Sequence, residues 1–191
     1  MKFINRNTIK LDKEANDLDE FVFDFINILK KHTDYVIVSG YVAILLGRSR
    51  TTEDIDIFIH EFSKDAFNKF YNELLKNDYW CLNSEDVNEI FDYLSEGLPV
   101  RFALINTTIP NFEIKVAKKI LDKESFKDRL TVITKLGKIY ISSLERQIAF
   151  KRYYLKSDKD IEDAKHIEEL FKDDIDIRKI DKYKQLLSKS Q

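Results

Sequence analysis

Cysteine, proline and glycine are scarce in this sequence, and each scarcity excludes a class of protein. The single cysteine, Cys81, cannot form an internal disulfide, and with His32, His60 and His166 it offers no closely spaced pair for a structural zinc site. Only four glycines and two prolines occur among 191 residues, of which 43% are hydrophobic, so a disordered or fibrous chain is excluded. We expect one compact unit or two small lobes in a reducing cytoplasm.

An excess of charge of one sign and a long apolar run are also missing. The 32 Lys and Arg residues balance 34 Asp and Glu residues, so any polyanion must be held by a local basic patch. The longest apolar stretch, Tyr35 to Leu46, is interrupted by Ser39 and Gly40 and is shorter than the ~20 residues of a membrane span. The N-terminus lacks the apolar region of a secretion signal. We therefore expect a soluble, cytoplasmic protein with no membrane partner.

Hydrophobic periodicity in the first third of the chain predicts helix and strand in alternation. Apolar residues at three- and four-residue steps indicate a helix from about Lys13 to Lys31. A short β-rich run from Tyr35 to Val38 ends at the Ser39-Gly40 turn, and a short helix from Tyr41 to Leu46 follows. Asp54 to Ile59 alternates acid and isoleucine, which is typical of a strand whose isoleucines face the core.

The middle of the chain predicts two helices and the rest of a sheet. Ser63 and Ser84 can each cap a helix, and Gly97 ends the second one. Further strands are expected at residues 79–82, 100–105, 112–117, 130–134 and 138–141.

The C-terminal third predicts helices only. Ser142 and Glu145 have capping-box spacing at the start of a helix to about Leu155, and two more helices are expected after it. We therefore predict an α+β fold, with a mixed β-sheet flanked by helices over residues 1–141 and a helical lobe over residues 142–191.

Asp54 and Asp56 are the first candidate site residues. Two apart in a strand, their carboxylates project from the same face at a Cα separation of about 7 Å. Paired anions repel, and aspartate is depleted in strands, so the arrangement lowers stability unless a cation lies between the two. Mg²⁺ prefers oxygen ligands and commonly takes one or two protein carboxylates together with water and substrate phosphates. The pair therefore predicts a magnesium site, which Mn²⁺ can also occupy; the alternative is two acids facing solvent.

The Ser39-Gly40 turn precedes this strand and is a candidate phosphate site. Gly40 lets a ligand approach the backbone closely, the helix after it offers free N–H groups and a positive dipole end, and the Ser39 hydroxyl adds a donor. Arg48 and Arg50, in the polar loop before Asp54, are placed to reach triphosphate oxygens, although exposed loop arginines are more often simply solvated.

The stretch from Val38 to Phe58 resembles the signature of the polymerase-β-type nucleotidyltransferase superfamily, a Gly-Ser or Gly-Gly turn followed by an acid-x-acid strand. Within that superfamily it is most similar to small prokaryotic members related to the abortive-infection (AbiEii-like) toxins. Their turn is commonly Gly-Gly, and Ser39 stands here in place of the first glycine. Their arginine loop resembles Gly47 to Thr52, which adds Thr52 to the candidate nucleotide-binding residues.

The resemblance implies a third metal-binding carboxylate on a later strand, beside Asp54 and Asp56. Relatives usually have Asp there, and Glu113 is the candidate in this chain. The alternative is a surface pair between Glu113 and Lys115 on an edge strand.

The resemblance continues in the helical third. Residues 143–151 are similar to the family's Ser-x-Glu-Asp-Leu-Ile-x-x-Lys helix, and residues 159–163 to its Lys/Arg-Asp-x-x-Asp helix. This implies that Lys151 contacts the triphosphate and that Asp160 assists catalysis. Arg146 occupies a position that is normally Asp.

These patterns support two hypotheses from different classes. The first is a metal-dependent nucleotidyltransferase that moves a nucleoside monophosphate from an NTP, such as ATP, to an acceptor hydroxyl. By resemblance the acceptor is the 3′ end of an RNA such as tRNA, or a protein side chain, and the chain has a cognate partner in a toxin–antitoxin or defence system. The second is a catalytically silent nucleotide-binding or regulatory module, which the departures at Ser39, Glu113 and Arg146 favour. A sheet that places Asp54 and Asp56 beside the turn would exclude an accidental match.

Overall fold

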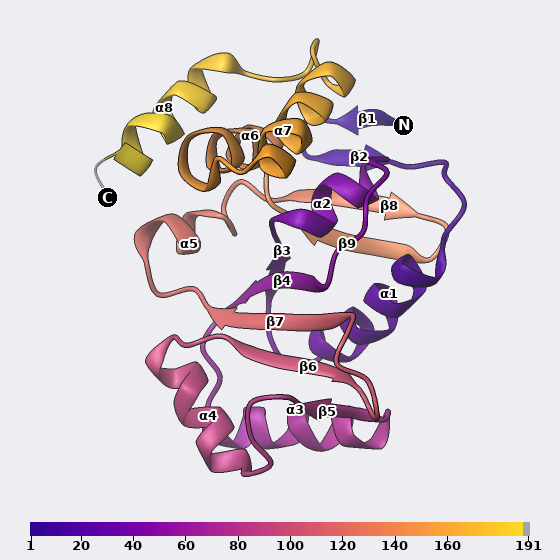
Figure 1. The fold of residues 1–191 in the computed structure, drawn as a ribbon, viewed down its shortest axis with the longest axis vertical. Coiled ribbons are helices and arrows are strands. Elements are labelled where there is room, and N and C mark those ends of the chain that lie inside the picture. Colours follow the sequence, from indigo (N-terminus) through magenta and orange to yellow (C-terminus); the bar gives the residue numbers. More distant parts are fainter. Residues whose placement is uncertain (189–191) are drawn as a thin grey trace.

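A nine-stranded mixed β-sheet forms the middle of the molecule, and its strands stack along the long axis (Figure 1). The computed structural model describes residues 1–188. The strand order is β1-β2-β8-β9-β3-β4-β7-β6-β5, which places β4 between β3, its antiparallel partner, and β7, its parallel partner. The strands are β1 Lys2–Asn5, β2 Thr8–Lys10, β3 Tyr35–Ile37, β4 Asp54–Ile59, β5 Tyr79–Cys81, β6 Val100–Leu104, β7 Asn111–Val116, β8 Leu130–Thr134 and β9 Gly137–Ile141.

One face of the sheet carries an aromatic core under three helices. These are α1 Asp17–Leu29, α3 Lys64–Lys76 and α4 Val87–Glu96. The Asn16 side chain caps α1 in the capping-box geometry that satisfies free N–H groups at a helix start. Phe25 of α1 stacks on Phe112 of β7 with ring centroids 3.8 Å apart, and Phe70 of α3 meets Phe102 of β6 edge to face. Burying these rings fixes this face as the core.

Strand alternation leaves the other face of β4 polar. Ile55, Ile57 and Ile59 are at most 1% exposed, which confirms the prediction that they face the core. Asp54 and Asp56 lie between them in sequence and therefore project from the opposite face. A register shift of one residue would exchange the two sets, so burial of the isoleucines also fixes where the acids lie.

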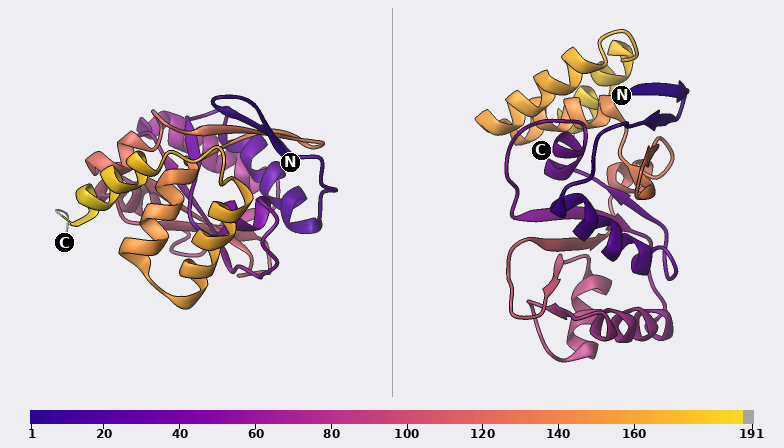
Figure 2. Two further views of the ribbon diagram at one scale, coloured as in Figure 1. Left: turned by 90° about the horizontal axis from the view of Figure 1, so that it is seen from above. Right: turned by 90° about the vertical axis from the view of Figure 1, so that its right-hand side faces the viewer.

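The helical lobe lies at the opposite end of the molecule from α3 and α4 (Figures 1 and 2). Its elements are α6 Leu144–Phe150, the π-helical turn η1 Lys151–Leu155, α7 Asp158–Leu170 and α8 Ile177–Ser188. Two short helices, α2 Gly40–Leu45 and α5 Ile120–Glu124, complete the fold, and α2 contacts both β4 and α7. Within residues 1–188, every helix is too short or too polar to span a bilayer. The predicted α+β class, with helices following a mixed sheet, is confirmed.

Two predicted helix caps are wrong. Ser84 does not cap α4, because Asp86 accepts the first free N–H groups of that helix instead. Ser142 and Glu145 do not form a capping box at α6, since the Glu145 carboxylate accepts a hydrogen bond from the backbone N–H of Asp176. In the first case a neighbouring residue caps the helix, and in the second the predicted capping residue binds a distant segment instead.

The helix predicted to reach Leu155 changes form after Phe150. The next turn is π-helical, ends at Leu155 and is followed by Lys156, whose φ is 62°. Such turns are rare and are frequent at functional sites. The sequence also failed to predict β1, β2 and α5, which have three to five residues each and are too short to show a period.

Candidate functional site

The turn between β3 and α2 brings Ser39 against the acidic strand. The backbone N–H of Val38 donates to the carbonyl oxygen of Asp56 at 2.9 Å, and the Ser39 hydroxyl is near enough to the Asp56 carboxylate to favour its charged form. Ser39 has φ 62° and ψ −132°, a region that glycine adopts readily and in which other residues are strained. The turn and the acid-x-acid strand therefore lie side by side. This placement excludes an accidental match of the sequence to the nucleotidyltransferase signature.

Asp56 lies at the centre of a group of carboxylates. In the parallel pairing of β4 and β7 it is opposite Glu113, and Asp54 precedes it by two residues on the same face. Burial, followed by the charge of Asp54 and that of Glu113, raises the pKa of Asp56 from 3.8 to about 6, although the Ser39 hydroxyl and the Lys151 charge oppose the change. The site therefore stores a repulsion that a bound cation would relieve.

The donor set fits a magnesium ion that shares its ligands with a substrate. Asp54 and Asp56 supply the one or two carboxylates that Mg²⁺ usually takes from a protein. Glu113 is instead ion-paired with Arg101, its antiparallel neighbour on β6. Within residues 1–188 no group of three His, Cys, Asp or Glu side chains is arranged to hold a metal by itself. The remaining ligands would come from water and from phosphate oxygens.

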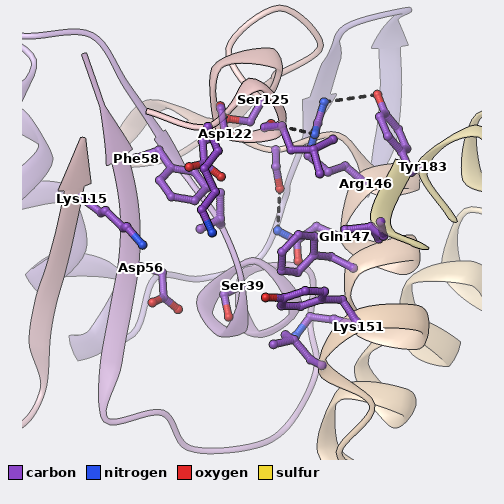
Figure 3. A pocket seen from close by; sticks show the side chains of 18 of the residues that line it. Ser39, Asp56, Phe58, Lys115, Asp122, Ser125, Arg146, Gln147, Lys151 and Tyr183 are labelled. Carbon is purple, nitrogen blue, oxygen red and sulfur yellow. Dashed lines mark hydrogen bonds between the residues drawn. The ribbon is translucent and has the colours of Figure 1, made fainter. Parts of the chain in front are cut away.

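A cavity of about 390 Å³ opens between this face of the sheet and the helical lobe (Figure 3). Its size lies within the range of small-molecule sites, roughly 300 to 1,000 Å³. Ser39, Asp56 and Glu113 line it together with Lys151. Its apolar and aromatic wall is formed by Val38, Ile57, Phe58, Leu121, Phe150, Tyr154, Leu155, Tyr183 and Leu187.

Lys151 reaches the cavity, but its charge is already compensated. The side chain is 1% exposed, and its ammonium lies 2.8 Å from a carboxylate oxygen of Asp163 and 3.3 Å from one of Asp160. Asp163, which is fully buried, also accepts two hydrogen bonds from Arg50, at 2.9 and 3.1 Å. Arg48 joins them, since its Nε lies 3.7 Å from Asp163 and its guanidinium pairs with Glu162, so three cations and three carboxylates form a neutral cluster behind the cavity wall. Buried charges are tolerated when they are paired in this way.

The same cluster explains why residue 40 is glycine. A Cβ atom on Gly40 would lie 2.7 Å from Nη2 of Arg50 and 3.3 Å from Oγ1 of Thr52. The same Nη2 donates to Asp163, so the guanidinium could move away only by breaking this hydrogen bond. The Thr52 hydroxyl donates to the carbonyl oxygen of Asp54 at 3.0 Å. Here the predicted phosphate-binding residues of this loop brace the turn and the acidic strand.

Three other candidates have partners of their own. Arg48 pairs with Glu162 of α7. Asp160 is buried near the start of α7, where its carboxylate accepts a hydrogen bond from Lys151. Among residues 1–188 it is not one of those that line the cavity. Arg146, which replaces an acid of the relatives, does line the cavity, and its guanidinium donates to Asp128 at 3.1 and 3.3 Å.

Two residues of this region were given no catalytic or binding role from the sequence. The alternative of a surface Glu113–Lys115 pair on an edge strand is wrong, because β7 is an interior strand and Glu113 pairs with Arg101. Asp163 lies three residues after Asp160 on a helix, and this spacing places both carboxylates on one side. Lys115 alternates with Glu113 on β7 and so projects from the same face of the sheet. The spacing of both residues was visible in the sequence. Their surroundings were not, because the side chains around them come from distant segments.

Comparison with known proteins also points to nucleotidyltransferases, as the sequence resemblance does. No curated protein matches the sequence. Two solved structures share the fold: an antigenic nucleotidyltransferase-like protein from Paracoccidioides brasiliensis (20% identity, 82% of this chain and 77% of that one, TM-score 0.54) and the lincomycin-bound lincosamide antibiotic adenylyltransferase LnuA (16% identity, 83% and 99%, TM-score 0.50). A family model described as nucleotidyl transferase of unknown function (DUF2204) matches residues 18–190. This chain belongs to that family of nucleotidyltransferases.

Proposed function

We propose that this protein is a metal-dependent nucleotidyltransferase that moves a nucleoside monophosphate from an NTP to an acceptor hydroxyl. The observation that carries the proposal is the placement of Asp56 opposite Glu113 on parallel strands, with Asp54 on the same face and the Ser39 turn beside them. Membership of a nucleotidyltransferase family supports this class of reaction. In the transfer, the acceptor oxygen bonds to the α-phosphorus while the bond to the pyrophosphate leaving group breaks.

The residues of the site take separate roles in this proposal. Asp54 and Asp56 hold Mg²⁺ or Mn²⁺, and Glu113 is the third carboxylate. A divalent cation bound there would neutralise charge that develops on the phosphate oxygens. Ser39 and the backbone of the turn hold phosphates, as positioning and charge stabilisation account for most of the rate in such transfers. Asp160 acts as a positioning residue through its hydrogen bond to Lys151.

The acceptor and the partner are finer proposals that rest on the resemblance to abortive-infection toxins. We propose an RNA 3′ end, such as that of tRNA, or a protein side chain as acceptor, and a cognate antitoxin as partner. One structural neighbour is an adenylyltransferase of a small antibiotic. The volume of the cavity, about 390 Å³, suits a nucleotide or a small acceptor, so small hydroxyl compounds belong in the same test.

Neutralised side chains at the site favour a second candidate, a silent nucleotide-binding module of the same fold. Glu113 is paired with Arg101, and Lys151 is held by Asp160 and Asp163. A site in which these groups are permanently occupied would bind a nucleotide without transferring it.

Transfer from labelled nucleotides separates the two candidates. The protein is incubated with each of the four α-labelled NTPs and magnesium, together with total RNA, protein lysate or small hydroxyl compounds. We expect label in one acceptor class with at least one NTP, loss of label with EDTA and with Asp56→Asn, and retention with Glu53→Gln, which changes an exposed acid just before β4. Binding of an NTP with no transfer to any acceptor class would favour the silent module.

A further inference from the structure

The cavity contains cations with and without compensating charges. Within residues 1–188 four cationic side chains line it: Lys115, Lys119, Arg146 and Lys151. Lys151 is neutralised by two carboxylates of α7, and Arg146 by Asp128. The protein's own carboxylates thus compensate both charges, so neither side chain adds net positive charge to the cavity. The free positive charge of the cavity therefore belongs to the other two lysines.

Lys115 is the more constrained of these two. It is half-buried on the interior strand β7, whereas Lys119 is exposed just before α5. In residues 1–188 the Lys115 ammonium has no hydrogen bond or ion pair, and Figure 3 shows it pointing into the cavity on the side of Asp56. At longer range its charge acts on Asp122, where burial raises the pKa and the charges of Lys115 and Lys119 oppose that change. A half-buried ammonium without a partner loses hydration that an anionic ligand would replace.

The position of Lys115 indicates which part of a nucleotide it would meet. It lies two residues after Glu113 on the same strand face, so its Cα is about 7 Å from that of the carboxylate. Phosphate oxygens shared with a metal at Asp56 would lie within this region. An ammonium group binds phosphate as a compact point charge and needs no bidentate geometry.

We propose that Lys115 binds the phosphate chain of the nucleotide, the role that resemblance gives to Lys151. Lys151 is then a structural cation that ties η1 to α7. The inference rests on the proposed function, because it concerns the substrate of the same cavity. It assigns the phosphate contact to a residue on the sheet, close to the carboxylates, and leaves the helical lobe as support.

Calorimetry with nucleotide, nucleoside and inorganic tripolyphosphate tests this assignment. Each of the four Mg-NTPs, its nucleoside and Mg-tripolyphosphate is titrated into wild type, Lys115→Met, Lys115→Arg and Lys118→Met. Lys118 is a matched control on the same segment, paired with Glu61 and outside the cavity. Lys115→Met should weaken NTP and tripolyphosphate binding roughly ten- to a hundredfold and leave nucleoside binding unchanged. Lys115→Arg should recover part of the loss, and Lys118→Met should bind as wild type does.

The outcomes separate this inference from the proposed function. If wild type binds an NTP and Lys115→Met binds it equally tightly, the phosphate assignment is overturned and the proposed function stands. If Lys115→Met weakens the nucleoside as much as the NTP, the lysine contacts the base or sugar and the assignment is also wrong. If wild type binds none of the four NTPs, the proposed function fails and the inference fails with it. Thermal melts confirm that each variant is folded.

Discussion

Replacing Asp56 by Asn should stabilise the metal-free protein and abolish transfer. The pKa of this carboxyl is raised from 3.8 to about 6, so the folded state binds its proton more tightly than the unfolded state does. The stability that the protonated carboxyl contributes is fully present below its pKa in the unfolded state, and it is lost as the pH rises through its folded-state pKa of about 6. Above that pH, the shift in the Asp56 pKa lowers the free energy of unfolding by at most about 3 kcal/mol. Asn keeps the shape and carries no charge, whereas a neutral amide is a poor ligand for magnesium.

Thermal melts at about pH 4, 6 and 8, with EDTA and with magnesium, measure this effect. In a chain of this length about 3 kcal/mol corresponds to roughly 6 to 12 °C, so this is the upper limit for the gain of Asp56→Asn over wild type in EDTA at about pH 8. The gain should vanish near pH 4, where Asp56 is protonated. Magnesium should raise the melting temperature of wild type and leave the variant nearly unchanged. Glu53→Gln should stay within about 0.5 kcal/mol of wild type. Equal melting of wild type and Asp56→Asn at high pH would refute the stored repulsion, and an equal response to magnesium would refute the metal site.

Two further substitutions test the structure around the site through urea denaturation. Asp163→Asn leaves Arg50 and Lys151 with one carboxylate between them, so the free energy of unfolding should fall by about 3 kcal/mol or more; an unchanged midpoint would show that the cluster does not support the fold. Ser39→Gly should raise the free energy of unfolding by about 1 kcal/mol because glycine adopts the observed backbone without strain. Ser39→Ala keeps the strain and should not raise it, and a loss of stability in Ser39→Gly would contradict the strained geometry.

Periodicity in the sequence predicted most helices and strands, but it did not predict β1 and β2 at one edge of the sheet. The strand predicted from Asp54 to Ile59 matches β4 residue for residue, because an acid-isoleucine alternation with one buried face has a single satisfactory register. The strands predicted at residues 130–134 and 138–141 are also found, and as β8 and β9 they pair with each other. β2 was not predicted, since it has only three residues and lies between β1 and β8, the second of which pairs with it in parallel from far along the chain. Contacts of this kind leave no local pattern.

The candidate site was predictable where its geometry is local. Two acids two residues apart in a strand share a face wherever the strand lies, so Asp54 and Asp56 needed no tertiary information. The position of Glu113 opposite Asp56 depends on the register of a parallel pair whose strands are separated by α3, β5, α4 and β6. The partners of Lys151 and Arg50 depend on how α7 docks, and a charged residue in a sequence does not indicate which charge it will meet.

The ion pairs of Asp163 have a consequence for motion. This one carboxylate joins the loop that supports the turn to the helical lobe, through Arg50 on one side and Lys151 on the other. Opening the lobe away from the sheet would separate buried charges, so a hinge at this place would carry a large energetic penalty. We expect the lobe and the turn to exchange their amide hydrogens as one cooperative unit. Substrates would then enter a cleft that is already formed, past Tyr154 and Leu155, whose side chains are 41% and 43% exposed, and no lid would need to close over them.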